Sequence, residues 1–307
     1  MAKAEILLAS YNGARYIHEQ IDSILQQTDD RWHLTVSDDG STDGTADILD
    51  AYAAQYPDKI TRLKSGKRFG NARDHFFYLI GQCDAEYIFT CDQDDRWYPD
   101  KVKKTLDVLV QTEKEVGKRT PVLVFSDQTP TDARLNPLAP SLMRYQNQFF
   151  AYFDYRSLLM QNVVTGGAMA FNRALSVQAM RCVDSTQTVM HDWWMAVVAA
   201  RFGRIVYIDE PLGDYRQHGS NSVGAKNVRS IEHIVHKIAH LDEIRSTIVH
   251  KKRQASMFAD TYGSTLLQED LLFLRNFSNL RSGPLFYIRN RVYIHGLFRL
   301  AGMMVLG

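Results

Sequence analysis

Hydrophobic and polar positions follow two different periods along the first part of the chain. Short apolar runs, typical of buried strands, are separated by longer stretches in which apolar residues recur every three or four positions, as on one face of a helix. The short runs are EILLAS (5–10), HLTVS (33–37), ITRLKS (60–65), YIFTC (87–91) and VLVFSD (122–127). The helical stretches are 13–27, 44–56 and 99–111. This alternation predicts βαβ units and an α/β fold with a mainly parallel sheet.

The second half of the chain has a different pattern. The glycines Gly166 and Gly167 precede a short strand of small residues. Residues 190–203 then form an apolar helix, and residues 204–221 a strand that ends in a polar loop. From about Lys226 onward the spacing is helical. We therefore expect a sheet domain over residues 1–222, with halves 1–127 and 128–222, followed by a helical C-terminal extension over 223–307.

Polar and acidic residues follow four of the predicted strands. The sequences at these points are SYNG (10–13), SDDGSTDG (37–44), CDQDD (91–95) and SDQ (126–128). In sheets of parallel strands, ligands bind in the crevice at the carboxyl ends of the strands. The recurrence therefore predicts a ligand crevice at this edge and is poorly explained by four unrelated helix caps.

Asp92, Asp94 and Asp95 place three carboxylates within four positions. Like charges this close repel, so they need a compensating cation or free access to water. One interpretation is a polar turn in which Asp94 or Asp95 caps a helix. The other is a divalent metal site, where the charge of the cation reverses the local electrostatics.

The segment SDDGSTDGT (37–45) also has two interpretations. Its acidic residues and glycine are spaced like the start of an EF-hand calcium loop, but the preceding HLTVS is strand-like where an EF-hand requires a helix. A turn in which Asp or Ser caps the next helix explains part of the pattern. A carboxylate at a strand end can also accept a hydrogen bond from the N3–H of uracil or thymine.

Composition narrows the classes of function. The 36 basic and 35 acidic residues give a formal net charge of +1, which provides no global attraction to nucleic acid. The three cysteines, Cys83, Cys91 and Cys182, have no CxxC spacing, which fits a reducing compartment. The N-terminal apolar run is too short for a signal peptide, and no apolar stretch has the length of a membrane span. These features predict a cytoplasmic protein.

The order of the motifs resembles that of a known family. ILLASYNGARYI, SDDGSTDGT, CDQDDRWYP, TGGAMAFN, HDWW and YRQHGSN follow one another, over residues 4 to about 222, as in the family 2, GT-A fold, inverting nucleotide-sugar glycosyltransferases. DQDDRW, MHDWW and YRQHGSN most resemble bacterial rhamnosyltransferases that build cell-wall polysaccharides from dTDP-L-rhamnose. The QxxRW motif and transmembrane helices of processive family members are not found, which favours a single or short-run addition.

The resemblance implies a role for each matched residue. Asp94 would ligate Mg²⁺ or Mn²⁺ on the donor diphosphate with help from His218, Asp92 would contact the ribose or support the metal, and Asp95 would act on the acceptor side. Asp38 would read the pyrimidine. The other residues implied at the nucleotide-sugar donor are Ser10, Tyr11, Asn12, Gly166 and Gly167. Arg68 or Arg73 would also reach the nucleotide or a phosphate, because a planar guanidinium binds oxyanions in a bidentate way; the alternative for each is a solvated helix face.

Inversion at the anomeric carbon requires a base that takes the acceptor proton. By the resemblance Asp192 is this base; the alternative is an N-cap for the helix that follows. Trp193 and Trp194 would stack on a sugar face on the acceptor side, with the alternative that at least one is core.

The expected reaction is transfer of L-rhamnose from dTDP-β-L-rhamnose to a glycan on a polyprenyl-type lipid carrier, forming an α-linkage. The closest alternative is a UDP-hexose or UDP-N-acetylhexosamine donor with the same fold and mechanism. A sugar-phosphate nucleotidyltransferase would need a lysine-rich phosphate loop, which LLASYNGARY lacks. A calcium-dependent glycan-binding module would leave MHDWW unexplained.

Residues 284–307 mix aromatic, aliphatic and arginine side chains without any acidic residue. Such a segment can lie in a membrane interface, with basic groups toward anionic headgroups, which would give peripheral contact with the inner face of the plasma membrane. The alternative is a helical tail that packs on the catalytic domain or on another subunit of a homo-oligomer.

Overall fold

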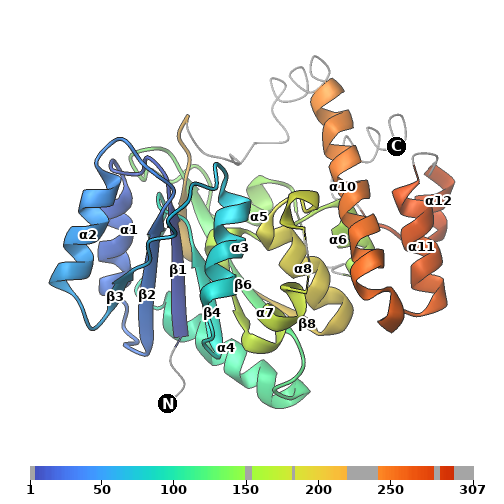
Figure 1. The fold of residues 1–307 in the computed structure, drawn as a ribbon, viewed down its shortest axis with the longest axis horizontal. Helices are drawn as coiled ribbons and strands as arrows, with labels where there is room; N and C mark the ends of the chain where they lie inside the picture. The colour runs from blue at the N-terminus through green and yellow to red at the C-terminus, as the bar shows by residue number, and fades with distance from the viewer. Residues whose placement is uncertain (1–3, 149–153, 182–183, 220–240, 280–283, 294–307) are drawn as a thin grey trace.

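The computed structural model describes residues 4–148, 154–181, 184–219, 241–279 and 284–293 (Figure 1). Within them, strands form one sheet in the order β3-β2-β1-β4-β7-β6-β8-β5. Their bounds are β1 (Ala4–Ser10), β2 (Trp32–Asp38), β3 (Ile60–Arg62), β4 (Tyr87–Cys91), β5 (Arg96–Trp97), β6 (Val122–Thr131), β7 (Met169–Asn172) and β8 (Arg204–Arg216). The sheet is mixed but mainly parallel in its first half, as the alternation of strands and helices predicts.

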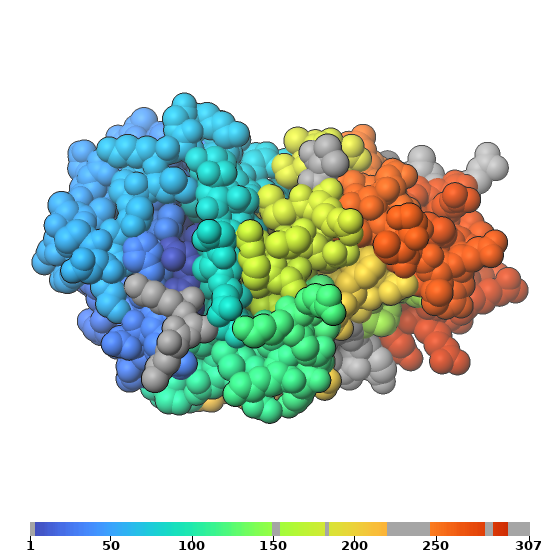
Figure 2. Space-filling model, turned by 60° about the horizontal axis from the view of Figure 1, so that its bottom comes forward, coloured from blue at the N-terminus to red at the C-terminus, as the bar shows by residue number. Residues whose placement is uncertain are grey.

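Helices cover both faces of this sheet, and the C-terminal helices pack at one end of the domain. Their bounds are α1 (Ile17–Leu25), α2 (Thr45–Gln55), α3 (Ala72–Gln82), α4 (Lys101–Val116), α5 (Leu142–Tyr145), α6 (Tyr155–Met160), α7 (Arg173–Ala179), α8 (His191–Phe202), α10 (Leu241–Tyr262), α11 (Gln268–Ser278) and α12 (Pro284–Arg289). Short 3-10 turns lie at Gly166–Ala168, Ser185–Gln187 and Gly263–Thr265. Helices α10 and α11 lie at the end of the molecule opposite α2 (Figures 1 and 2).

The two-residue period of the strands divides the core into two layers. Alternate strand residues such as Leu7 and Ile88 face a cluster with α3, α7 and α8, while their neighbours Leu8 and Phe89 face a cluster with α1, α2 and α4. All four of these side chains are at most 1% exposed. A sheet buried on both faces requires near-continuous apolar strands, which is the pattern seen in EILLAS and YIFTC.

The register of the strands brings the polar strand ends to one edge. Strand β1 pairs in parallel with β2 and β4, with Ser10 opposite Asp38 and Leu8 opposite Cys91. Strand β7 is antiparallel between β4 and β6, so its amino end, next to Gly166 and Gly167, lies at the same edge. The chain therefore collects its acidic turns and its glycine pair at one edge of the sheet.

Several element boundaries differ from the sequence expectations. Strand β3 stops at Arg62, whereas β6 continues to Thr131 along the bulged register of β8. Helix α3 was not predicted, because its apolar residues are too dense to show a helical period; its start is capped by Asn71, whose side chain accepts a hydrogen bond from the backbone N–H of Asp74. The predicted division near residue 222 falls in 220–240, outside the described residues.

The C-terminal helices pack against the sheet domain through aromatic residues and one buried carboxylate. Trp194 of α8 lies against Phe258 and Tyr262 of α10, with ring centroids 5.8 and 6.0 Å apart. Asp270 of α11 is 4% exposed and binds Arg156 at 3.0 Å and Arg201 at 2.9 Å. These contacts hold α10 and α11 on α6 and α8.

Of the segment 284–307, only 284–293 is among the described residues. Across the described part of the chain, we find no helix with the length and apolar character needed to cross a bilayer.

Replacing Asp270 with alanine is expected to lower the free energy of unfolding by about 3 kcal/mol, because Arg156 and Arg201 lose their buried partner. The neighbouring Glu269→Ala provides a matched control: the Glu269 side chain is 72% exposed and lies 3.9 Å from Arg156, so its loss should cost less than about 0.5 kcal/mol. Urea unfolding measures both values. Equal losses would show that Asp270 does not anchor the C-terminal helices.

Candidate active site

The turn Asp92–Asp95 joins β4 to β5 and is held by groups from β6 and β8. Asp95 is 1% exposed and accepts hydrogen bonds from the backbone N–H of Arg216 at 3.1 Å and from Gln128 Nε2 at 3.2 Å. The Arg216 guanidinium also donates through Nε to the backbone carbonyl of Asp94 at 2.7 Å. The carboxylates are therefore fixed in place by the fold, in contrast to those of a solvated acidic turn.

The glycine pair lies directly against these carboxylates. A Cβ on Gly167 would approach Asp92 Oδ2 to 2.7 Å and Asp95 Oδ2 to 3.0 Å, so only glycine fits here without displacing the carboxylates. A Cβ on Gly166 would lie 3.1 Å from His191 Nε2 and 3.7 Å from Asp192 Cβ. The pair thus connects the acidic turn after β4 to the first turn of α8, which the sequence placed in two separate motifs.

Burial and mutual repulsion shift the proton affinity of this cluster. Burial, with the nearby charges of Asp94 and Asp192, raises the pKa of Asp92 to about 7. Burial and the charges of Asp94 and Asp92 raise the pKa of Asp95 well above its ordinary value. The same carboxylates lie close enough to Tyr215 to add to the effect of burial, which raises the pKa of its phenol. The edge of the sheet is therefore a site that favours the arrival of a cation.

Lys101 is a buried cation that the sequence analysis did not identify. It is 1% exposed, donates from Nζ to the carbonyl of Gly167 at 2.8 Å and lies 4.3 Å from the ring centroid of Trp97. Burial lowers the pKa of Lys101 to about 8, and the opposing charges of Asp95 and Asp92 limit the fall. Its position at the start of a predicted helix gave no sign of burial, because lysines there are usually solvated.

Asp94 and His218 form the pair that suits a metal ion. Asp94 Oδ2 lies 2.7 Å from His218 Nε2, and the imidazole packs on the ring of Tyr16 with centroids 4.6 Å apart. Among the residues that the structure describes, no group of three His, Cys, Asp or Glu side chains is arranged around a common metal position. Mg²⁺ needs only one or two protein ligands when substrate phosphates complete its shell, so this pair fits Mg²⁺ or Mn²⁺ bound together with a diphosphate.

Asp192 is the second residue of α8, which has Met190 at its N-cap position. The N-cap alternative for Asp192 is therefore wrong, because the helix already begins at His191. Asp192 Oδ1 accepts from the backbone N–H of Trp193 at 2.7 Å, and Oδ2 from Asn162 Nδ2 at 3.2 Å. Burial raises the pKa of Asp192 to about 6, a value that suits a base.

The two tryptophans after Asp192 have different environments. Trp194 is fully buried and donates from Nε1 to the carbonyl of Ala179 at 2.9 Å, so the expectation that it contacts the acceptor is corrected: it is a core residue. Trp193 is partly exposed and donates to the carbonyl of Leu158. For Trp193 the acceptor-side role stays a prediction.

The loop after β1 is bound to the acidic turn by Gln93, the residue between Asp92 and Asp94. Gln93 Oε1 accepts from Ser10 Oγ and from the backbone N–H of Tyr11, both at 2.9 Å, and its Nε2 donates to the carbonyl of Tyr11 at 2.9 Å. The sequence analysis assigned no role to Gln93, since a glutamine in a polar turn carries no specific signal. In the structure it couples the predicted nucleotide loop to the predicted metal motif.

The loop after β2 completes this side of the site. Asn12 receives a hydrogen bond at its Oδ1 from the backbone N–H of Thr42, and its own N–H donates to Ser41 Oγ at 2.8 Å. Asp38 Oδ2 accepts from the backbone N–H groups of Gly40 and Ser41, at 3.1 and 2.9 Å, and Oδ1 accepts from the Ser41 hydroxyl. Because a carboxylate oxygen has more than one lone pair, Oδ1 retains capacity for one further donor.

The two arginines expected at the nucleotide lie in different places. Arg68 donates to the Tyr11 hydroxyl at 2.6 Å and lies 5.0 Å from the centroid of its ring, beside the β1 loop. Arg73 instead binds Asp74 and the carbonyls of Thr186 and Thr188, the latter at 3.1 Å. Its guanidinium holds α3 to the segment before α8, so the structure supports a tethering role for Arg73 in place of the expected nucleotide contact.

Gln93→Met is expected to weaken binding of a nucleoside diphosphate with Mn²⁺ about tenfold, because the variant keeps a similar side-chain size but loses all three hydrogen bonds to Ser10 and Tyr11. Calorimetric titration measures the affinity, and Gln55→Met on the exposed end of α2 controls for the substitution itself. Unchanged affinity in the Gln93 variant would show that the loop and the acidic turn are not coupled.

Comparison with known proteins agrees with this geometry. Residues 5–181 match the family described as "Glycosyl transferase family 2". The dTDP-rhamnosyl transferase RfbG of Shigella flexneri is 31% identical over 222 residues, which cover 71% of this chain and 74% of the relative.

Two solved structures share the fold. TarS residues 1–349 of S. aureus in complex with UDP-GlcNAc superposes with a TM-score of 0.54 at 13% identity, over 99% of this chain and 90% of that one. The mannosyltransferase PcManGT of Pyrobaculum calidifontis in complex with GDP-Man and Mn²⁺ has a TM-score of 0.54 at 15% identity, over 99% and 86%. The fold is that of GT-A glycosyltransferases, as expected, and the chain belongs to glycosyl transferase family 2.

Proposed function

We propose that the protein is an inverting rhamnosyltransferase. It transfers L-rhamnose from dTDP-β-L-rhamnose to a glycan on a polyprenyl-type lipid carrier, a precursor of a cell-wall or surface polysaccharide, and forms an α-linkage. The observation that carries the proposed chemistry is the convergence of carboxylates around the glycine pair: Asp92 and Asp95 lie against Gly167, and Asp192 lies against Gly166. The charges of Asp94 and Asp192 both act on Asp92. The rhamnosyl assignment is supported by the similarity to the Shigella dTDP-rhamnosyl transferase.

The nucleotide lies, in this proposal, across the carboxyl ends of β1 and β2. Ser10, Tyr11 and Asn12 contact the base and ribose, and the free lone pair of Asp38 Oδ1 accepts the N3–H of the pyrimidine. Arg68, already beside Tyr11, is positioned to reach a phosphate oxygen. Gly166 and Gly167 would lie beside the donor sugar, because without side chains their backbone packs directly against Asp92, Asp95 and the start of α8.

The diphosphate is held at the other end of the crevice. Asp94 and His218 would ligate Mg²⁺ or Mn²⁺, with Asp92 in support. When bound, the metal disperses the charge that develops on the leaving diphosphate. Lys101 donates to the Gly167 carbonyl and keeps a positive charge near Asp92 and Asp95.

Asp192 acts on the opposite side of the anomeric carbon. The acceptor hydroxyl oxygen forms a bond to this carbon as the bond to the diphosphate oxygen breaks, and Asp192 takes the hydroxyl proton. Asn162 and the backbone N–H of Trp193 fix the carboxylate of Asp192 in one orientation. Attack opposite the leaving group inverts the configuration, which converts a β-linked donor into an α-linked product.

Asp192→Asn is expected to retain donor affinity within about twofold and to lower the transfer rate at least about 100-fold, because the amide cannot take the proton. In the parent, kcat should fall about tenfold per pH unit below about 6, where a carboxylate with this raised pKa becomes protonated. Product formation from labelled donor measures both. Transfer near the parent rate would remove Asp192 from the base role.

Asn162→Ala offers a second check, since Asn162 donates to the charged form of Asp192. Loss of this hydrogen bond should move the acid limb of the pH profile to higher pH. Asp58→Asn, at an exposed position, is the control that should leave the profile unchanged.

The donor is tested by calorimetric titration with dTDP, UDP and GDP, each with Mn²⁺ and with EDTA. Metal-dependent preference for dTDP supports the rhamnosyl proposal. Preference for UDP would keep the mechanism and assign the donor to the alternative, a UDP-hexose or UDP-N-acetylhexosamine. Binding of none of the three would contradict the proposed catalytic role.

A further inference from the structure

Exposed apolar side chains gather on the C-terminal helices. Of the eight large apolar residues that are exposed in the described part of the chain, five lie between residues 267 and 293, with exposed fractions from 45 to 69%. Leu272 belongs to α11, and Leu285 and Ile288 belong to α12. Single exposed leucines are ordinary, but a group on two adjacent helices marks an interaction surface.

These side chains are not required for the packing of the helices themselves. The inward face of α12 is formed by Tyr287, which is 2% exposed and meets the ring of Phe277 of α11 edge to face. Phe286 stacks on Phe273 with centroids 5.4 Å apart. Tyr287 and Phe286 therefore pack α12 against α11. Leu285 and Ile288 take no part in this packing, and their exposed side chains can contact a partner.

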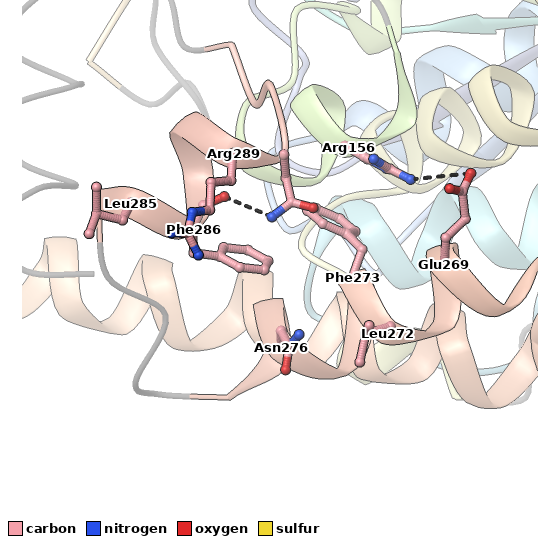
Figure 3. A pocket seen from close by; sticks show the side chains of 9 residues that line it. Arg156, Glu269, Leu272, Phe273, Asn276, Leu285, Phe286 and Arg289 are labelled. Carbon is pink, nitrogen blue, oxygen red and sulfur yellow. Dashed lines mark hydrogen bonds and ion pairs between the residues drawn. The ribbon is translucent and has the colours of Figure 1, made fainter.

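Exposed basic residues lie on the same two helices and directly after them. Arg275 on α11, Arg289 on α12 and the following Arg291 are all exposed. Leu272, Leu285 and Arg289 line one pocket between the two helices, at whose far end Glu269 pairs with Arg156 (Figure 3). We call the surface of Leu272, Arg275, Leu285, Ile288, Arg289 and Arg291 the α11–α12 patch.

We propose that the α11–α12 patch docks on the surface of an anionic lipid bilayer. Leucine and isoleucine enter the boundary between headgroups and acyl chains, and the arginines meet the anionic headgroups, a combination that suits an interfacial surface. The patch has three exposed arginines, and the neighbouring carboxylate of Glu269 pairs with Arg156, so a surface of opposite charge complements the patch better than a second copy of the same basic surface does. The bilayer therefore matches both the apolar and the charged part of the patch.

The patch is held rigidly on the catalytic domain. The backbone N–H of Tyr293, just after α12, donates to Ser157 Oγ of α6 at 3.0 Å. Asp270 joins α11 to Arg156 and Arg201. Docking would therefore orient the whole enzyme on the membrane, and this inference does not depend on the identity of the sugar donor.

The test uses the full chain and sedimentation with phosphatidylcholine vesicles, with and without phosphatidylglycerol. We expect binding to the vesicles that contain phosphatidylglycerol and a loss of binding at high salt. Leu285→Asp combined with Ile288→Asp should lower the partition coefficient at least about tenfold. Val177→Asp, at a 54% exposed position on α7, is the matched control and should bind like the parent.

Arg289→Gln combined with Arg291→Gln should weaken binding about 25-fold, because each arginine near an anionic surface contributes roughly fivefold. Equal binding to vesicles without phosphatidylglycerol, or unchanged binding in the leucine-isoleucine variant, would overturn the proposal. The proposal would also be overturned if the parent protein formed a dimer and did not bind vesicles, and if the leucine-isoleucine variant were monomeric. Nucleoside-diphosphate titration of the same samples shows separately whether the donor site works.

Discussion

The accumulation of carboxylates at the carboxyl edge of the sheet is the constraint on which the rest of the site depends. Asp92 and Asp95 lie together against Gly167, where burial and repulsion favour protonation. Two basic residues offset this repulsion. Lys101 lies close to the two carboxylates, and Arg216 binds the turn through its backbone N–H and its guanidinium. An edge balanced in this way suits the metal ion and the diphosphate that we propose for it.

The same constraint explains why the glycines are a pair. Gly167 makes room for the acidic turn and Gly166 for the start of α8, so the site needs two adjacent positions without a side chain. Thr90 of β4 also donates to the Gly166 carbonyl at 2.6 Å, which fixes the pair relative to the sheet. In the proposed mechanism, one short segment would therefore set both the leaving-group side and the base side of the reaction.

Much of the fold was predictable, because periodicity reports directly on burial. The strands at EILLAS and YIFTC and the helix at 190–203 follow from apolar patterns that match the observed elements within one or two residues. Helix α3 escaped prediction, since its dense apolar residues show no clear period. The ordered motifs also located Asp94, His218 and Asp192, which the structure places around one edge.

The parts that sequence could not predict depend on contacts between distant segments. Lys101 and Gln93 have ordinary polar side chains, and only the folded chain shows that one is buried under the carboxylates and the other bonded to Tyr11. Trp194 and Arg73 were expected to contact ligands, yet Trp194 packs into the core and Arg73 tethers α3. A motif gives the position of a residue along the chain but not the direction of its side chain.

The most direct test of the central claim is the position of a metal ion at the acidic edge. Crystals of the protein with dTDP and Mn²⁺, measured at the manganese absorption edge, should give one anomalous peak in contact with Asp94 and the diphosphate, beside His218. A peak remote from Asp94, or ordered dTDP at this edge without manganese, would contradict the account.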